Sequence, residues 1–158
     1  MKDKKIKESL KKVYNNIAED FSVSRAHMED DYKVLLPYFK KGTFILDLGC
    51  GSGRLAAFLK NNHIKTHYIG VDNSEALIKV AKKNNPGFKF EIGDIENYVI
   101  QGKNPDLVVC FRTFHHLPSR KSRRNCLKNI QNLTALNGNI FITVWNLWHK
   151  DFKHKYNK

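Results

Sequence analysis

The sequence predicts an α/β fold, a Rossmann-like doubly wound sheet of about five parallel strands with helices on both faces. Short apolar runs alternate with amphipathic segments from residue 43 onward, and glycine or proline separates several of them. The chain has 158 residues, 41% of them hydrophobic, which suits one domain with a real core. Alternating strands and helices require right-handed crossovers, so a ligand is expected at the carboxyl ends of the strands.

Two helices are expected before the sheet. Between residues 6 and 21, apolar side chains recur at steps of three and four, and lysines occupy the opposite face. A second, shorter helix is expected over residues 32–39. Together, residues 1–41 are expected to form a helical cap of the ligand site.

The sheet and its helices follow in order. Strands are expected over residues 43–48, 66–71, 89–92, 106–111 and 139–145. Helices are expected over residues 55–61, 75–83 and 120–136, the second capped near Ser74 and the last ended by Asn137-Gly138 as its C-cap. Residues 42–146 are then the core domain, and residues 147–158 form a basic, aromatic tail.

The first strand leads into a glycine-rich loop. Residues 45–53 read Ile-Leu-Asp-Leu-Gly-Cys-Gly-Ser-Gly. Glycine permits positive φ and leaves no Cβ to block a ligand, and the free N–H groups of the next helix would face this loop. Residues 51–56 formally fit a dinucleotide pattern. However, Asp47 precedes the first glycine by two residues, which is poor for a pyrophosphate and good for the ammonium of S-adenosylmethionine.

Two further acids follow the next strands. Asp72 ends the second strand, where a carboxylate can accept both ribose hydroxyls. Asp94 and Ile95 follow the third strand, where they could bind an adenine amino group and cover its ring. Each acid alone could be a turn or cap residue. All three together favour a cationic, phosphate-free cofactor.

These runs resemble class I S-adenosylmethionine-dependent methyltransferases. The resemblance rests on ILDLGCGSG, YIGVDNS, GDIENY and DLVVCFRTFHHLPS, in the order and spacing of that family between residues 43 and 145. It implies that Asp47 and the glycines hold the methionine part, and that residues 110–112 line the pocket behind it. The cofactor-binding residues that it implies are Tyr14, Arg25, Asp47, Gly49, Cys50, Gly51, Gly53, Asp72, Asn73, Asp94, Ile95, Cys110, Phe111 and Arg112.

A narrower resemblance lies in the flanks. Residues 13–25 and 141–148 are similar to the branch that contains the tRNA wobble-uridine carboxymethyl methyltransferases. In that branch Tyr14 and Arg25 would close over the cofactor. The chain departs from it at residues 28–31, where a Trp-Pro pair is often found. The family's fold also normally continues with two more strands, which this chain is expected to lack.

The catalytic residues are left open. A carboxylate acceptor is already ionised, so it needs no general base. His115, His116 and Arg112 are candidates for a base or a substrate contact, although one histidine could pack and the other cap the next helix. Cys110 could be a nucleophile or a small core residue. No metal site is expected, and the odd number of cysteines without a CxxC pair favours the reducing cytoplasm.

The formal net charge of +13 points to a polyanionic partner, most often nucleic acid. RNA, with tRNA as the sharpest choice, is expected to contact the basic patches. A small-metabolite or protein methyltransferase, or a non-catalytic cofactor- or RNA-binding module, are the alternatives.

No apolar run nears the ~20 residues that a membrane span needs. Residues 139–145 would form an apolar edge strand that could pair with a second copy or an activator subunit. The patches are the lysines of residues 2–12, Arg120, Lys121, Arg123, Arg124 and Lys128, and Lys150, Lys153, Lys155 and Lys158 of the tail.

Overall fold

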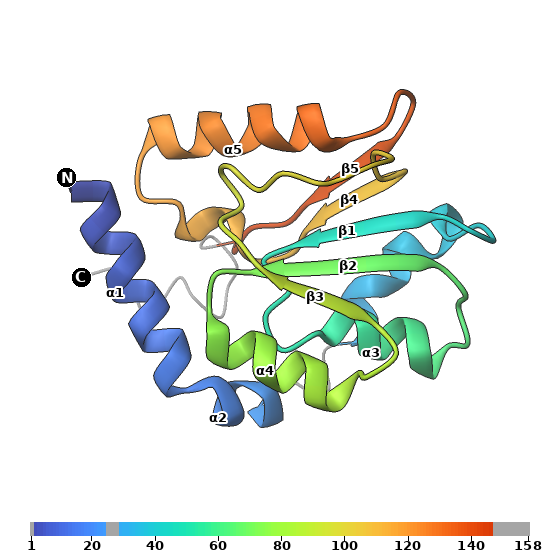
Figure 1. Ribbon diagram of the computed structural model, residues 1–158, viewed down its shortest axis with the longest axis horizontal. Helices are drawn as coiled ribbons and strands as arrows, with labels where there is room; N and C mark the ends of the chain where they lie inside the picture. The colour runs from blue at the N-terminus through green and yellow to red at the C-terminus, as the bar shows by residue number, and fades with distance from the viewer. Residues whose placement is uncertain (1, 25–28, 147–158) are drawn as a thin grey trace.

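The computed structural model describes residues 2–24 and 29–146 (Figure 1). Arg25 and the predicted tail lie outside the described residues. The helices are α1 (Lys2–Asn16), α2 (Ala18–Ser24), η1 (Glu29–Tyr38), α3 (Arg54–Asn61), α4 (Glu75–Asn84), η2 (Phe114–His116) and α5 (Arg120–Leu133). The strands are β1 (Phe44–Leu48), β2 (His67–Asp72), β3 (Lys89–Ile92), β4 (Leu107–Cys110) and β5 (Asn139–Ile142).

The five strands form one sheet in the order β3-β2-β1-β4-β5, and every neighbouring pair is parallel. This confirms the predicted fold class. The first strand is central, with Ile45 opposite Tyr68 on one side and Leu107 on the other. The chain changes direction across the sheet between β1 and β4, so the glycine loop after β1 opens at the switch point.

Helices cover both faces of the sheet. On one face η1, α3 and α4 pack their side chains, among them Leu35, Phe58 and Ile78, onto the strands. On the other face α5 contributes Cys126 and Ile130 (Figure 1). All four residues of β4 are buried, as expected for a parallel strand covered on both sides.

The N-terminal helical segment differs from the prediction in two ways. The helix expected over residues 6–21 is two helices, because the chain turns at Ile17 after Asn15 and Asn16, whose helix propensity is low. The second, shorter helix expected over residues 32–39 is present as the 3₁₀ helix η1, which begins earlier, at Glu29, and contains Pro37. None of the residues of α1 is buried, so this helix lies on the surface of the sheet domain rather than in its core.

The last helix ends earlier than predicted. Its C-cap is Thr134, because the N–H of Ala135 donates to the carbonyl of Pro105 at 2.9 Å and draws the chain to the sheet. Asn137 adopts a φ of 63°, and the N–H of Gly138 donates to the carbonyl of Ala135 at 2.8 Å. The Asn-Gly pair is therefore the turn into β5, and its assignment as a helix cap is wrong.

The edge strand β5 is shorter than predicted, since its strand pairing ends at Ile142. The chain stays tied to β4 beyond that point. The N–H of Thr143 donates to the carbonyl of Cys110 at 3.1 Å, and the N–H of Arg112 donates to Thr143 Oγ1 at 2.9 Å. These bonds carry the segment after β5 towards the carboxyl ends of the central strands.

No helix within residues 2–24 or 29–146 has the length and apolar character that crossing a membrane requires. The three cysteines are free and buried. The cytoplasmic location remains a prediction.

Candidate active site

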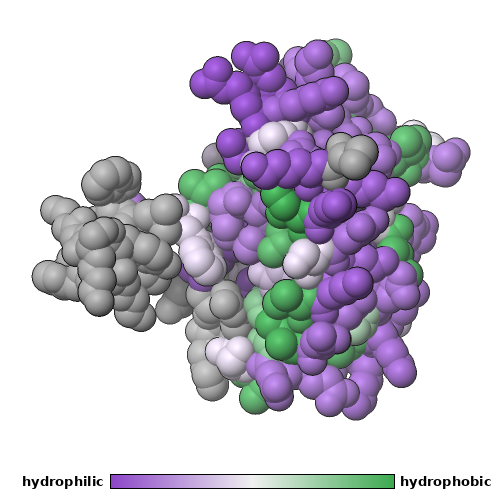
Figure 2. All heavy atoms as spheres, turned by 90° about the vertical axis from the view of Figure 1, so that its left-hand side faces the viewer, coloured by the Kyte–Doolittle hydropathy of each residue, from purple (hydrophilic) through white to green (hydrophobic). Residues whose placement is uncertain are grey.

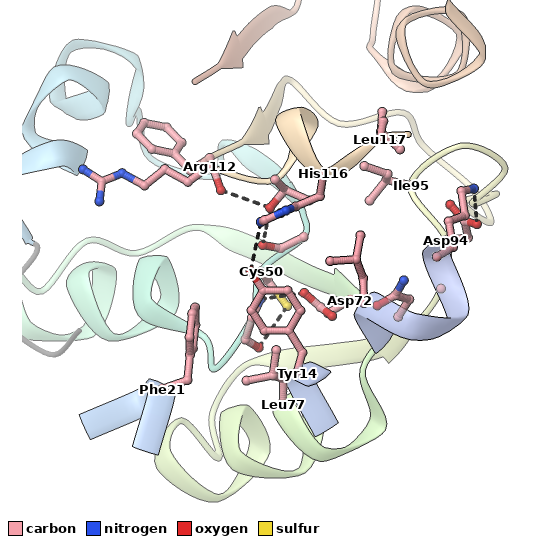
Figure 3. A pocket seen from close by; sticks show the side chains of 18 of the residues that line it. Tyr14, Phe21, Cys50, Asp72, Leu77, Asp94, Ile95, Arg112, His116 and Leu117 are labelled. Atoms are coloured by element: carbon pink, nitrogen blue, oxygen red, sulfur yellow. Dashed lines mark hydrogen bonds and ion pairs between the residues drawn. The ribbon is translucent and has the colours of Figure 1, made fainter. Parts of the chain in front are cut away.

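A pocket lies at the carboxyl ends of β1, β2, β3 and β4, and α1 and α2 close its outer side (Figure 3). The loop after each of these four strands contributes to its wall. The lining residues are Lys7, Leu10, Tyr14, Phe21, Gly49, Cys50, Gly51, Arg54, Asp72, Asn73, Leu77, Gly93, Asp94, Ile95, Phe111, Arg112, Thr113, His116, Leu117 and Trp145.

The three loop glycines all adopt positive φ, at 79°, 54° and 81°, as the sequence predicted. They differ in what surrounds them. A Cβ on Gly49 would lie 2.2 Å from Thr113 Oγ1, and one on Gly53 would lie 2.9 Å from Asn85 Nδ2. A Cβ on Gly51 would meet only Phe21, at 3.7 Å across the pocket. Only Gly51 therefore leaves open space for a ligand, and the other two glycines allow close packing within the protein.

Asp47 lies beneath the loop and does not line the pocket. Its side chain is only 4% exposed, and Tyr68 Oη donates to Asp47 Oδ2 at 2.8 Å. Burial raises the pKa of Asp47 to about 7, although the Tyr68 hydrogen bond and the charge of Arg54 oppose that rise. A cation arriving above the loop would stabilise the ionised carboxylate.

Asp72 faces the pocket at the end of β2 (Figure 3). The N–H of Gly51 donates to Oδ2 at 3.0 Å and the N–H of Ser74 to Oδ1 at 2.9 Å. Burial raises the pKa of Asp72, and these backbone hydrogen bonds oppose the rise. Each carboxylate oxygen retains acceptor capacity, so the pair can still bind two hydroxyl groups.

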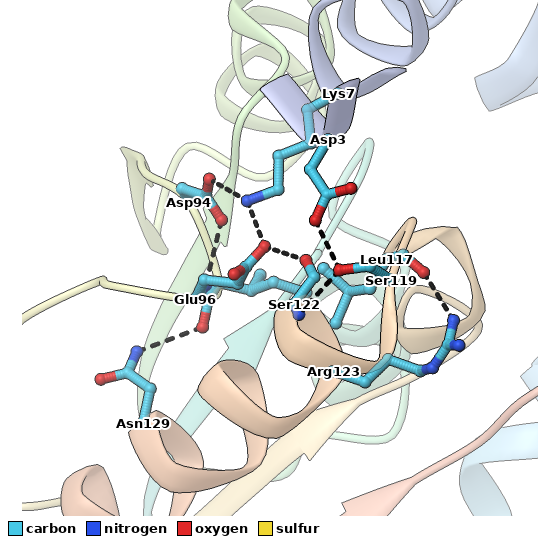
Figure 4. Close-up of polar contacts among 10 residues, drawn as sticks. Asp3, Lys7, Asp94, Glu96, Leu117, Ser119, Ser122, Arg123 and Asn129 are labelled. Carbon is cyan, nitrogen blue, oxygen red and sulfur yellow. Dashed lines mark hydrogen bonds and ion pairs between the residues drawn. The ribbon is translucent and has the colours of Figure 1, made fainter. Parts of the chain in front are cut away.

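Asp94 is bound by a residue that the sequence reasoning did not select. Lys7 Nζ donates to Asp94 Oδ2 at 2.8 Å and also pairs with Glu96 (Figure 4). Burial disfavours the charge of Lys7, but the two carboxylates outweigh it and raise its pKa. Lys7 shares a helix face with Leu10 and Tyr14, at i, i+3 and i+7, so the expectation that the lysines lie opposite the apolar residues is wrong for Lys7. This spacing is the signal that could have revealed it.

Further polar contacts attach α1 to the pocket wall. Ser119 Oγ donates to Asp3 Oδ2 at 2.5 Å (Figure 4), and Lys11 Nζ pairs with Glu75 Oε1 at 2.8 Å. Near the end of the helix, Ser74 Oγ donates to Asn15 Oδ1 at 2.6 Å. The helix is thus held at several points along its length by polar contacts.

The last residue of β4 and the two residues after it lie in different environments. Cys110 is fully buried in the core with α5, so its expected place in the lining is wrong, and burial raises its thiol pKa well above the usual range. Phe111 lines the pocket. Arg112 also lines it, but it adopts a φ of 52° and its guanidinium reaches Asp31 at 2.6 Å, away from the cavity (Figure 3).

The two histidines differ as well. His116 lines the pocket, and its Nε2 lies 2.9 Å from Tyr14 Oη. His115 does not line it, and neither of its ring nitrogens has a hydrogen-bond partner among the described residues. Burial, with the nearby charges of His116 and Arg112, lowers the pKa of His115 to about 4, so this ring is neutral at neutral pH.

The pocket suits binding and orientation better than covalent or metal chemistry. Burial also raises the thiol pKa of Cys50 well above its ordinary value, which leaves no reactive thiolate. No group of three metal-ligating side chains occurs among the described residues. The acids, the open Gly51 and the apolar Leu77 and Ile95 match a cationic nucleoside cofactor.

Sequence comparison gives the family. A model of the methyltransferase domain matches residues 45–138, which is more than half of the chain. The chain belongs to the methyltransferase domain family. Its cofactor is S-adenosylmethionine, in agreement with the acids and the glycine loop.

The relatives of this chain include tRNA methyltransferases and an O-methyltransferase of ubiquinone biosynthesis. The chain is 27% identical over 143 residues to the tRNA (carboxymethyluridine(34)-5-O)-methyltransferase of Saccharomyces cerevisiae, covering 90% of this chain and 50% of that protein. It is 32% identical over 111 residues to the ubiquinone biosynthesis O-methyltransferase of Coxiella burnetii, covering 67% and 45%. The chain spans 33% of the length of the tRNA (carboxymethyluridine(34)-5-O)-methyltransferase of Arabidopsis thaliana and 50% of the length of the yeast enzyme.

The fold has a close counterpart among solved structures. A TehB-like methyltransferase from Corynebacterium glutamicum superposes with a TM-score of 0.70 at 21% identity, covering 93% of this chain and 80% of that one. At this identity the likeness concerns the fold alone.

Proposed function

We propose that the chain is an S-adenosylmethionine-dependent methyltransferase that acts on tRNA, with a carboxymethyl group on the wobble uridine as its acceptor. The observation that carries the activity is the pocket, where Gly51, Asp72 and Asp94 meet at the carboxyl ends of three strands. The tRNA acceptor is supported by the similarity to the yeast enzyme along most of this chain and by the net charge of +13.

Each part of the cofactor has a matching group in this proposal. Asp47 supplies negative charge below the loop for the ammonium, and Asp72 accepts the ribose hydroxyls. Asp94 accepts a hydrogen bond from the adenine amino group through carboxylate lone pairs that the Lys7 hydrogen bond does not occupy. Ile95 packs on the adenine ring. When bound, the cofactor supplies a methyl group on a positively charged sulfur. Residues 1–41 act as the cap of this site.

The protein's contribution to the reaction is positioning. A carboxylate acceptor is already ionised at neutral pH, so no protein group needs to remove a proton from it. Orienting two reactants can lower a barrier by roughly 7–11 kcal/mol. The Tyr14 hydroxyl and His116, 2.9 Å apart at the pocket, are placed to hydrogen-bond an acceptor carboxylate. We therefore assign these two groups, rather than His115, to the acceptor.

Basic side chains near the pocket would bind the RNA backbone. Figure 2 faces the side that carries α1, and hydrophilic side chains gather at its top, the side of α5. Lys7 and Lys11 are engaged in ion pairs with acids, so they contribute little net charge to such a surface. Lys4 pairs with Glu8 at 4.0 Å. The other exposed cations on α1 and α5 are Lys2, Lys5, Lys12, Arg120, Lys121, Arg124 and Lys128.

The test is transfer of a tritiated methyl group to tRNA that carries 5-carboxymethyluridine. We expect transfer to this tRNA, none to the same tRNA with an unmodified wobble uridine, and none from an Asp72→Ala variant. Replacing Arg124 and Lys128 with alanine should raise KM for tRNA, whereas Lys65→Ala, on the strand end away from the pocket, should not.

Two outcomes would replace this proposal. Methyl transfer to a small carboxylate, phenol or protein with no salt-dependent binding of RNA would indicate the metabolite or protein alternative. Binding of cofactor and RNA without any transfer would indicate a non-catalytic module.

A further inference from the structure

A row of aromatic rings borders the pocket on the side of His116. Tyr14 and Phe21 meet edge to face with centroids 5.4 Å apart, and Tyr14 lies 5.6 Å from the His116 ring. His116 contacts the His115 ring at 4.2 Å, and His115 lies 5.0 Å from Trp145 at an interplanar angle of 33°. The row thus runs from α2 across the mouth of the pocket to the segment after β5.

Trp145 is the outermost ring of this row. It lines the pocket and is 43% exposed, so part of a large apolar ring remains in contact with water beside the site. The hydrogen bonds between Thr143 and both Cys110 and Arg112 hold the backbone before it against the end of β4. The ring is therefore held by the sheet and does not depend on a long loop.

The ring beneath Trp145 is suited to support it. His115 is neutral and its nitrogens have no hydrogen-bond partner among the described residues, so its role there is to pack against the indole. The polar groups at this side belong to Tyr14 and His116, which line the same pocket and are less exposed than Trp145. The arrangement offers a flat apolar platform at the rim and less exposed hydrogen-bonding groups in the same pocket.

We propose that Trp145 is the stacking platform for the acceptor base, so that an unpaired pyrimidine of single-stranded RNA lies on the indole and points its substituent at Tyr14 and His116. This rests on the proposed function. Aromatic side chains commonly bind unpaired bases in this way, because every base presents a flat π-face. The net charge of +13 favours a nucleic acid over an uncharged flat metabolite.

Fluorescence tests the stacking directly. The chain has two tryptophans, so Trp148→Phe leaves Trp145 as the sole indole fluorophore. We titrate this variant, saturated with S-adenosylhomocysteine, with an anticodon stem-loop RNA that carries 5-carboxymethyluridine and with the same RNA abasic at that position. We expect quenching by the first RNA and little by the second, while both bind. Equal quenching by the two RNAs would overturn the proposal.

Kinetics provides the second measurement. Loss of one stacked base corresponds to about 1–3 kcal/mol, so Trp145→Leu should raise KM for the stem-loop roughly 5- to 150-fold. Trp145→Phe should retain most of the affinity for the stem-loop. Because Trp145 lines the same pocket as the cofactor, both variants are assayed at saturating S-adenosylmethionine. Val144→Ala is the matched control, since Val144 is the neighbouring residue and is 55% exposed. An active Trp145→Leu enzyme with an unchanged KM would refute the stacking.

The two proposals fail separately. Base-dependent quenching without methyl transfer by the wild-type chain would refute the proposed function and retain the stacking role. Methyl transfer to the stem-loop without base-dependent quenching would refute the stacking role and retain the proposed function.

Discussion

Replacing Asp47 with asparagine should make the cofactor-free protein more stable and its cofactor affinity lower. The substitution keeps the shape of the side chain and an oxygen that can accept from Tyr68 Oη. It removes a charge from a site that is 4% exposed. In the free protein the cost of burying that charge outweighs the Tyr68 hydrogen bond and the attraction of Arg54, and in the complex the charge would face the cofactor ammonium.

The magnitude follows from the pKa of Asp47, which burial raises from its ordinary value of 3.8 to about 7. Because the folded-state pKa lies above the unfolded one, the contribution of this group to stability is complete below about pH 4 and is lost as pH rises to about 7. The loss is at most on the order of 4 kcal/mol at alkaline pH. An asparagine side chain does not ionise, so the Asp47→Asn variant should escape this loss.

Urea denaturation at about pH 4, 6 and 8 measures the effect. The variant should match the wild type at the lowest pH and exceed its unfolding free energy increasingly towards the highest. Calorimetry at the highest pH should show weaker binding of S-adenosylmethionine. Tyr68→Phe is the matched control, because it keeps the carboxylate and removes its donor, and it should lower stability at the highest pH. A variant no more stable than the wild type at any pH would show that the buried charge carries no such cost.

Three other perturbations test separate parts of the structure. Gly51→Ala should weaken cofactor binding in calorimetry. Gly49→Ala should instead lower the unfolding free energy by a few kcal/mol, about the cost of overpacking and strain together, because its Cβ would lie 2.2 Å from Thr113 Oγ1. Lys7→Met should lower the unfolding free energy by about 1–3 kcal/mol at neutral pH, because it removes the cation that the Asp94 and Glu96 carboxylates share, although each carboxylate keeps another donor. The difference should shrink as pH rises above the raised pKa of Lys7, and an exposed Lys4→Met control should change little. If β5 pairs with a second copy, Ile140→Lys should convert a dimer into a monomer in sedimentation. A monomeric wild type would contradict that pairing, and an activator subunit would then be the remaining candidate partner of this edge strand.

The elements of the sheet were predictable because their signals are local. Each strand was indicated by a short, largely apolar run, and all five runs correspond to strands of the sheet to within a few residues. Turn chemistry was less decisive. Asn137-Gly138 is typical both of a helix end and of a tight turn, and a hydrogen bond from Ala135 to the distant Pro105 determined which of the two it is.

The details of the site depended on contacts between distant parts of the chain. Gly49 is needed because of Thr113, 64 residues later, and Lys7 reaches Asp94 across 87 residues. The helical spacing places Lys7 beside Leu10 and Tyr14, but no local pattern identifies Thr113 or Asp94 as the distant partner. Cys110 is a different case, because the alternation of side chains along β4 is a local pattern, and it directs Cys110 towards α5 rather than towards the cavity.

The attachment of α1 has a consequence for the dynamics of the protein. A helix without a buried residue, fastened by ion pairs and hydrogen bonds, can detach by sub-global unfolding at a free energy far below that of the whole domain. The amides of α1 should therefore exchange with solvent hydrogen much faster than those of β1 and β4. Since Lys7, Leu10 and Tyr14 line the pocket, a bound cofactor should slow exchange in α1 selectively. The rate at which this helix opens would then set an upper limit on the rate at which the spent cofactor leaves.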